Sequence, residues 1–133
     1  MGPDIRVSIN HEADIITARQ KGRELAAELG FTAGELALVA TAISEITRNV
    51  IAYAGRGEMT IRIVQNQTRR AVEIVVEDHG AGIVDLERAM QDGYSTSNGL
   101  GLGLPGAKRL MDDFDVDTEV GRGTRVVMRK WAK

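Results

Sequence analysis

The first part of the chain combines one strand-like alternation with two helical periodicities. Residues 6–9 alternate polar and apolar side chains, which predicts a short strand. We expect a first helix from about Glu12 to Leu29, capped by Asn10 and ended by Gly30. The apolar positions of this helix are Ile15, Ile16, Ala18, Leu25, Ala26 and Leu29.

A capping box opens the second helix. Thr32 is followed three residues later by Glu35, and the helix should run to about Tyr53. Its apolar positions recur at steps of three and four residues, which predicts a face packed on a core. They are Leu36, Val39, Ile43, Ile46, Val50 and Tyr53.

The remainder of the chain predicts two β-hairpins with a helix between them. A helix should begin near Leu102, with Pro105 in its first turn, and end near Asp112. The second hairpin should turn at 121–123. The strands are expected at 59–65, 71–77, 114–120 and 124–131, one or two helical turns at 85–90, and a polar mobile loop at 91–98.

The order of these elements predicts the fold class. Strand hairpins interleaved with helices are typical of α+β proteins, in which the helices lie on one side of a sheet. We therefore expect a two-layer sandwich, with a mostly antiparallel, mixed sheet and helices on one face. The length of 133 residues fits a single domain, residues 1–133.

Composition narrows the classes of function. The net charge is −2 and Lys and Arg are scattered, so we expect no nucleic-acid partner. No segment approaches the length of a transmembrane helix, and the N-terminal residues carry neither an apolar run nor a lipidation signal. We therefore expect a cytoplasmic protein without a membrane partner. The absence of cysteine excludes disulfides and thiolate metal sites.

A polar triplet on the second helix is the first of four candidate motifs. Glu45, Arg48 and Asn49 share one helical face, which we expect to lie opposite the apolar stripe. A carboxylate and a carboxamide one turn apart can hold Mg²⁺ against phosphates, since this ion prefers oxygen ligands. Taken alone, the triplet favours an exposed polar face with a weak Glu–Arg ion pair.

The second motif follows a predicted strand at Asp78-His79-Gly80-Ala81-Gly82. A carboxylate at a strand end can accept a hydrogen bond from an exocyclic amine, and the two glycines allow the backbone to approach a flat ring. An ordinary Asp/Gly turn is an equally good interpretation of this motif alone.

The third motif runs from Gly99 to Gly103 and precedes a helix. Backbone N–H groups and the positive end of the helix dipole converge at such a turn, which favours a phosphate cradle over a hinge. A dinucleotide fold is excluded because no strand precedes the glycines, and Lys108 lacks the neighbours that a P-loop requires. The fourth motif, Gly121-Arg122-Gly123-Thr124, is by itself best explained as a hairpin turn.

These four motifs, in this order and spacing, resemble the GHKL superfamily of nucleotide-binding domains, which includes the histidine kinases. The resemblance implies that they line one pocket for ATP and Mg²⁺ under a mobile lid at about 93–98. The phosphates would be wrapped by Gly99, Leu100, Gly101, Leu102 and Gly103.

The resemblance also assigns roles to the other motifs. Glu45 would be the general base and Asn49 the Mg²⁺ ligand. Asp78 would accept a hydrogen bond from the adenine amino group. The remaining adenine-side residues would be Gly80 and Gly82, which line the base, and Thr124, which closes it.

Within the superfamily, the stretches 41–49, 92–97 and 104–112 look like the RsbT-type switch kinases of the stressosome. These belong to the single-domain bacterial serine/threonine kinases of partner-switching pathways. Ser97 stands close to the place where related anti-sigma kinases carry an Arg that meets the γ-phosphate, and we include it among the nucleotide-binding residues.

A cation for the γ-phosphate would then have to come from elsewhere. The candidates are Arg48, which we count among the nucleotide-binding residues, Lys108 and a residue of a partner protein. The sequence does not decide between them.

The resemblance implies an ATP- and Mg²⁺-dependent serine/threonine protein kinase. Its substrate would be a STAS-domain partner that holds the kinase until it is phosphorylated, after which the kinase would activate a downstream PP2C-type phosphatase. Two alternatives stay open. One is an anti-sigma factor that sequesters a σ subunit and phosphorylates an anti-anti-sigma factor. The other is a pseudo-enzyme that binds ATP as a folding ligand, against which the intact Glu45 and Asn49 argue.

Overall fold

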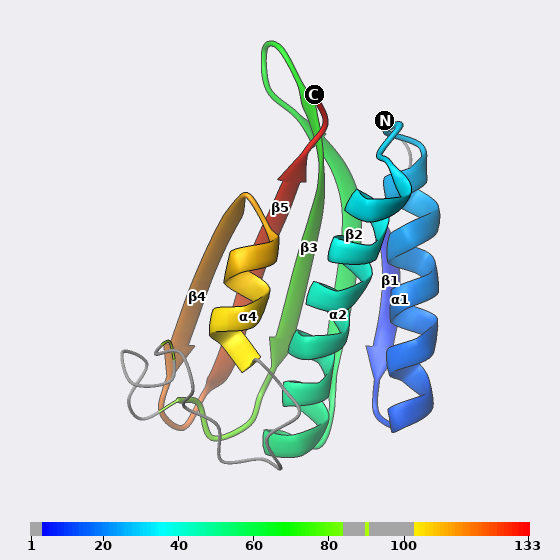
Figure 1. Cartoon of the computed structure of the whole chain (residues 1–133). Helices are drawn as coiled ribbons and strands as arrows, with labels where there is room; N and C mark the ends of the chain where they lie inside the picture. Colours follow the sequence, from blue (N-terminus) through cyan, green and yellow to red (C-terminus); the bar gives the residue numbers. More distant parts are fainter. Residues whose placement is uncertain (1–3, 84–89, 91–102) are drawn as a thin grey trace.

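The computed structural model of the chain describes residues 4–83, 90 and 103–133. In that part, three helices cover one face of a five-stranded sheet (Figure 1). The elements in chain order are β1 (Ile5–Ile9), α1 (Glu12–Ala27), α2 (Ala33–Tyr53), β2 (Gly57–Gln65), β3 (Arg70–Asp78), α4 (Gly103–Leu110), β4 (Asp113–Glu119) and β5 (Gly123–Trp131).

The strand order in the sheet is β1-β2-β3-β5-β4, and all four pairings are antiparallel. The predicted two-layer α+β sandwich is confirmed, although among the described strands the sheet is not mixed. The reason is the position of β5, which lies between β3 and β4 (Figure 1). The strand after α4, β4, runs parallel to β3, but these two strands do not pair with each other.

The helix starts show one confirmed and one wrong prediction. Thr32 caps α2, and its capping box with Glu35 is present as predicted. Asn10 was expected to cap α1, but the N-cap position belongs to His11. The carboxylate of Asp14 accepts hydrogen bonds from the backbone N–H groups of both Asn10 and His11. Asp14 thus satisfies the two backbone N–H groups that immediately precede the first turn of α1.

α2 is the central helix of the helical layer and lies between α1 and α4 (Figure 1). Its predicted apolar face is largely buried, with Val39 and Ile43 fully enclosed. Tyr53 is 59% exposed, contrary to the prediction that it faces the core, and Ile16, one of the apolar positions of α1, is exposed to the same extent. Ile16 adjoins buried Ile15, so one of two consecutive apolar residues on a helix must point outward.

α2 also corrects the expectation about transmembrane length. Its 21 residues meet the length and composition of a membrane span. Half of the qualifying window is buried inside the fold, as in the core helix of a globular domain. Length and apolar content alone do not separate these two kinds of helix.

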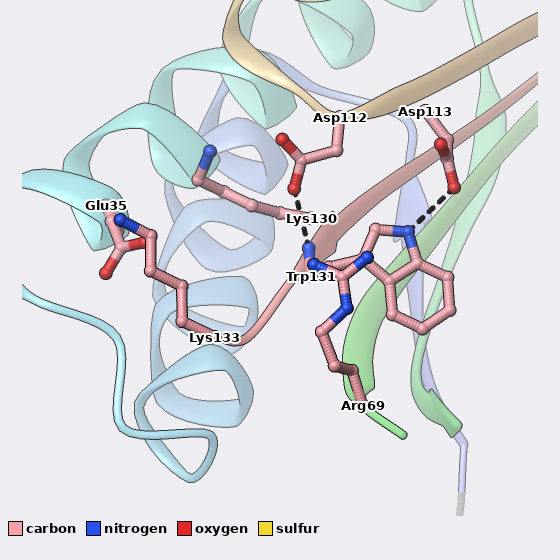
Figure 2. Close-up of a pocket in the computed structure, with 7 residues that line it drawn as sticks. All are labelled: Glu35, Arg69, Asp112, Asp113, Lys130, Trp131 and Lys133. Atoms are coloured by element: carbon pink, nitrogen blue, oxygen red, sulfur yellow. Dashed lines mark hydrogen bonds between the residues drawn. The ribbon is translucent and has the colours of Figure 1, made fainter. Parts of the chain in front are cut away.

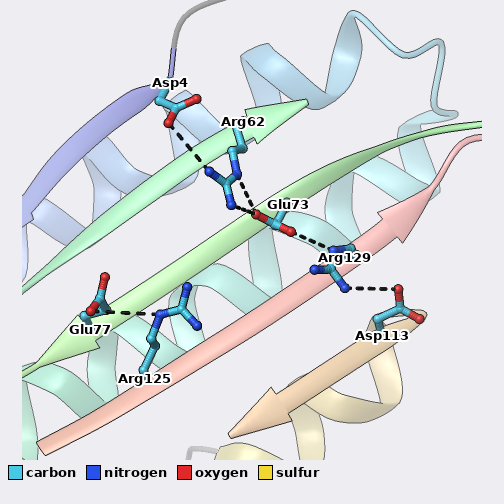
Figure 3. A network of polar contacts seen from close by, with 7 residues as sticks. All are labelled: Asp4, Arg62, Glu73, Glu77, Asp113, Arg125 and Arg129. Carbon is cyan, nitrogen blue, oxygen red and sulfur yellow. Dashed lines mark hydrogen bonds and ion pairs between the residues drawn. The ribbon is translucent and has the colours of Figure 1, made fainter. Parts of the chain in front are cut away.

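The face of the sheet away from the helices is held by charge pairs (Figure 3). Glu73 on β3 is 3% exposed and receives Nε–H bonds from Arg62 at 2.6 Å and Arg129 at 2.7 Å. Arg62 also pairs with Asp4, and Arg129 with Asp113. A carboxylate can stay buried here because a cation from each neighbouring strand contacts it.

Candidate active site

One end of the sandwich brings together the segments that carry the predicted motifs. It consists of the second half of α2, the turn that follows β3, the first residue of α4 and the β4–β5 turn (Figure 1). We call this region the glycine end and define it as residues 45–54, 78–83, 103 and 118–124. β3 and α2 both finish at this end, whereas α4 begins there (Figure 1).

Glu45 is buried rather than solvent-facing. Glu45 is 8% exposed, and its carboxylate oxygen Oε2 accepts a hydrogen bond from the backbone N–H of Gly103 at 3.2 Å. The other oxygen, Oε1, lies 3.3 Å from Nη1 of Arg48. The prediction that this helical face lies opposite the core was therefore wrong for Glu45, because α4 packs beside α2 and covers it.

Arg48 and Asn49 lie at the edge of that covered region. The side chain of Arg48 is 53% exposed and forms the i,i+3 ion pair with Glu45 that the sequence suggested. Asn49, one turn beyond Glu45, is partly exposed. In the described part of the chain its carboxamide makes no hydrogen bond, so its oxygen is available to a ligand.

Asp78 ends β3 and is flanked on both sides by other strands. Its register partners are Gly57 on β2 and Thr124 on β5. Oδ1 of Asp78 accepts a hydrogen bond from the backbone N–H of Gly80 at 2.9 Å. This Asx-type turn fixes the carboxylate through one oxygen, and no described residue donates to Oδ2.

The glycines of two motifs permit close backbone contacts that the sequence did not reveal. Gly123 has φ +124°, and a Cβ there would lie 2.1 Å from the carbonyl oxygen of Asp78. Gly82 has φ +80°, and its Cβ would lie 2.4 Å from the carbonyl oxygen of Glu119. The turn after β3 and the β4–β5 turn therefore pack backbone against backbone, which only glycine allows.

Thr118 joins the same two turns and was missed in the sequence analysis. Its Oγ1 accepts from the backbone N–H of Ile83 at 2.9 Å. The same hydroxyl lies 3.1 Å from the carbonyl oxygen of Gly123 and 2.9 Å from Oγ1 of Thr124. A threonine in an edge strand carries no signal for such a role, because the contact depends on a turn 35 residues away in sequence.

Part of the predicted site lies outside the described residues. The predicted site residues outside the description are Ser97, Gly99, Leu100, Gly101 and Leu102. The predicted loop at 91–98 also lies outside it, as do the predicted helical turns at 85–90, except for Met90. Of the predicted phosphate cradle, Gly103 alone is described, where it is the first residue of α4.

The described residues suit a metal that is shared with a ligand. They contain no group of three or more His, Cys, Asp or Glu residues able to hold an ion. Mg²⁺ is commonly bound by one or two protein oxygens together with phosphates and water. The available carboxamide oxygen of Asn49 fits that arrangement.

A pocket lies at the opposite end of the sandwich (Figure 2). It has a volume of about 490 Å³ and is bordered by residues of both charges. We call this region the charged end and define it as Glu35, Arg69, Asp112, Asp113, Lys130, Trp131 and Lys133. None of the predicted nucleotide-binding residues belongs to it.

A family model for the histidine kinase-like ATPase domain matches residues 10–130. The chain is 47% identical over 127 residues to the serine/threonine-protein kinase RsbT of Bacillus subtilis, covering 96% of each chain. It is 36% identical over 109 residues to an anti-sigma F factor of Clostridium beijerinckii, covering 78% of this chain and 76% of the relative.

Solved structures support the fold. The crystal structure of the RsbU and RsbW domains of a Mycobacterium tuberculosis protein matches 97% of this chain with a TM-score of 0.66 and 19% identity, over 32% of its own length. The mycobacterial sensor histidine kinase MprB matches 98% of this chain and 99% of its own with a TM-score of 0.57 and 17% identity.

Proposed function

The chain belongs to the histidine kinase-like ATPase domain family and, within it, is of the RsbT type of serine/threonine kinase; from that premise we propose how its residues act and on what. ATP donates a phosphoryl group to a serine or threonine hydroxyl of a partner protein. The observation that carries this proposal is the placement of Glu45, Asn49, Asp78 and Gly103 at one end of the sandwich.

One side of the proposed site binds the adenine base and the other side binds the phosphates. Asp78, anchored through Oδ1, offers Oδ2 to the adenine amino group, with Gly80, Gly82 and Thr124 around the base. On the phosphate side, Gly103 is the first residue of α4, and its N–H lies at the positive end of the helix dipole, which favours anions. By the resemblance, Ser97 and residues 99–102 would also bind the phosphates.

The transfer itself relies on positioning and on neutralising charge. Glu45 is the one buried carboxylate at the glycine end, and we assign it the task of accepting the proton of the acceptor hydroxyl. Asn49 holds Mg²⁺ through its carboxamide oxygen. When bound, the ion offsets the negative charge of the phosphate oxygens.

Arg48 is the candidate that best fits the cation for the γ-phosphate. Its guanidinium already lies 3.3 Å from Glu45 and is half exposed, so it can reach a ligand beside the base. Lys108 sits five residues into α4, about 7 Å along the helix axis from Gly103, and is exposed. Arg48→Ala should therefore slow transfer more than Lys108→Ala, and the reverse result would reassign the cation.

The proposed substrate is a STAS-domain protein that binds the kinase until it is phosphorylated. The released kinase then activates a PP2C-type phosphatase, in the cytoplasm. This proposal rests on similarity to RsbT over almost the whole chain. The alternative is an anti-sigma factor that sequesters a σ subunit, which the similarity to an anti-sigma F factor favours.

One experiment separates these functions. The protein is mixed with labelled ATP, Mg²⁺ and either a STAS-domain protein or a σ subunit, and both phosphate transfer and complex formation are measured. We expect label on the STAS protein, and weaker binding once its acceptor residue is replaced by Asp, because the added charge meets an acidic protein. Tight σ binding would favour the alternative, and no labelling of any STAS protein would contradict the kinase proposal.

A further inference from the structure

Both oxygens of Glu45 are occupied by donors from the site itself. The Gly103 N–H donates to Oε2, and the Arg48 guanidinium donates to Oε1. The carboxylate is buried, so these two contacts replace the water that would otherwise solvate it. A buried anion thus sits at the N-terminus of α4.

These two donors are also phosphate-binding groups in the proposed function. The N–H of the first residue of a helix, together with the helix dipole, is a preferred place for a negative group. The guanidinium of Arg48 is suited to phosphate oxygens as well as to carboxylates. A phosphate brought to these donors would meet the negative charge of Glu45 beside it.

We propose that Glu45 is a resident anion that takes the place of phosphate in the empty protein and opposes nucleotide binding. Phosphate binding draws Gly103 and Arg48 away from the carboxylate, which frees Glu45 to accept a proton. The base is therefore held inactive until the nucleotide arrives. This inference rests on the proposed function, since it assumes that phosphates bind at the start of α4.

Loss of the Glu45 carboxylate should therefore strengthen nucleotide binding, although it should slow phosphate transfer. Removing the charge of Glu45 removes a competitor for Gly103 and Arg48, so phosphate-containing ligands should bind more tightly. A charge at a helix N-terminus is worth about 0.3–2 kcal/mol, which corresponds to a gain of roughly 2- to 30-fold. Adenosine carries no phosphate and should gain nothing.

The test compares ADP with adenosine by calorimetry in excess EDTA, for the unaltered chain, Glu45→Gln and Glu45→Ala. We expect ADP to bind about 3- to 10-fold more tightly to both variants, whereas the affinity for adenosine stays the same. Glu119→Gln is the matched control, because it also removes one negative charge at the glycine end. Glu119 is exposed and pairs with Arg122, not with Gly103. Its affinity for ADP should be close to that of the unaltered chain.

A second measurement does not depend on the variants folding well. The amide resonance of Gly103 in the unaltered protein should move when ADP is added, because its acceptor changes from carboxylate to phosphate. A Gly103 resonance unmoved by saturating ADP would overturn the inference, as would equal or weaker ADP binding in both variants. Equal gains for ADP and adenosine would also overturn it. If neither ligand binds the unaltered chain, the proposed function itself fails.

Discussion

The two ends of the sandwich are stabilised in different ways. At the glycine end, backbone packs on backbone at Gly82 and Gly123, and hydrogen bonds run between main-chain groups and a few side chains. At the charged end, charged and aromatic side chains make most of the contacts: the indole N–H of Trp131 donates to Asp113 at 2.9 Å, and the Arg69 guanidinium lies 5.5 Å from the Trp131 ring centroid (Figure 2).

This difference supports our proposal that the nucleotide binds at the glycine end. The glycine end leaves Oδ2 of Asp78 and the carboxamide of Asn49 without donors or acceptors among the described residues. In the charged end, the ammonium group of Lys130 reaches the carbonyl oxygen of Leu110 at 3.4 Å, and Asp112 accepts from the backbone N–H of Trp131. Mutual pairing of this kind stabilises a surface, whereas polar groups without a partner recruit one.

The largest expected effect concerns chemistry at the glycine end. Glu45→Ala removes the proposed base, so phosphate transfer to a partner protein should fall by roughly 10²-fold or more. Nucleotide should still bind, because the adenine contacts of Asp78 are untouched. Transfer at the unaltered rate, measured in single turnover with saturating ATP, would show that Glu45 serves structure alone.

The next effect concerns the backbone contact that forms the glycine end. Gly123→Ala places a methyl group against the carbonyl oxygen of Asp78 at a strained φ, and should destabilise the fold by about 2–4 kcal/mol. Gly121→Ala is the control, because its φ of +86° is also unfavourable but nothing lies within 4 Å. That variant should lose only about 1 kcal/mol in denaturant unfolding. Equal losses would mean that the close contact carries no cost.

A smaller effect should separate nucleotide affinity from stability. Asp78→Asn keeps an oxygen for the Gly80 N–H but can turn an amide donor toward the adenine amine, so ATP affinity should fall by about 1–3 kcal/mol. Asp117→Asn, an exposed carboxylate on β4, is the charge-matched control and should bind ATP normally. Calorimetry that finds ATP affinity unchanged in Asp78→Asn would remove the adenine assignment.

The charged end should respond in stability only. Asp113→Asn weakens the pair with Arg129 and the bond from the Trp131 indole, and should cost about 0.5–1 kcal/mol of unfolding free energy. Asp115→Asn changes an exposed neighbour on the same strand and should cost less. Neither variant should alter ATP affinity, and a clear loss of affinity in Asp113→Asn would tie this end to the active site.

The sequence predicted the elements far better than it predicted what buries each residue. Periodicity located α2 and its capping box because both signals are local along the chain. It placed Glu45 on a solvent-facing surface, because no local pattern shows that a helix from residues 103–110 will cover it. The same limit applies to Thr118, whose partners lie on another turn.

The sequence motifs, by contrast, predicted which residues lie close together in space. Asp78 and Thr124 were placed in one pocket by resemblance, and the register makes them neighbours on adjacent strands. Gly82 was expected to line the adenine base, yet it packs closely on the backbone of Glu119, and Gly123 of the hairpin turn packs in the same way on Asp78. The sequence motifs therefore converge on one end of the molecule, but they did not show how that end is built.

The smallest expected effect is an acid dependence of stability that belongs to the start of α2. The backbone N–H of Thr32 donates to the carboxylate of Glu35, which lowers the pKa of that group below its usual value of 4.5. Because the pKa is lower in the folded state, the contribution is complete above the unfolded value. It should be lost as the pH falls through the folded value.

Glu35→Gln isolates this contribution. The amide oxygen can still accept from Thr32, so the capping box keeps its geometry but no longer titrates. Unfolding curves measured from pH 6 down to about pH 3 should therefore be flatter for Glu35→Gln than for the unaltered chain. Glu28→Gln is the matched control, because Glu28 is exposed at the C-cap of α1 and its carboxylate accepts no hydrogen bond from a described residue. If both variants change the acid dependence equally, general charge rather than the cap is responsible. If ATP affinity changes with Glu35→Gln at neutral pH, the two ends are coupled and the contrast between them is weaker than the contacts suggest.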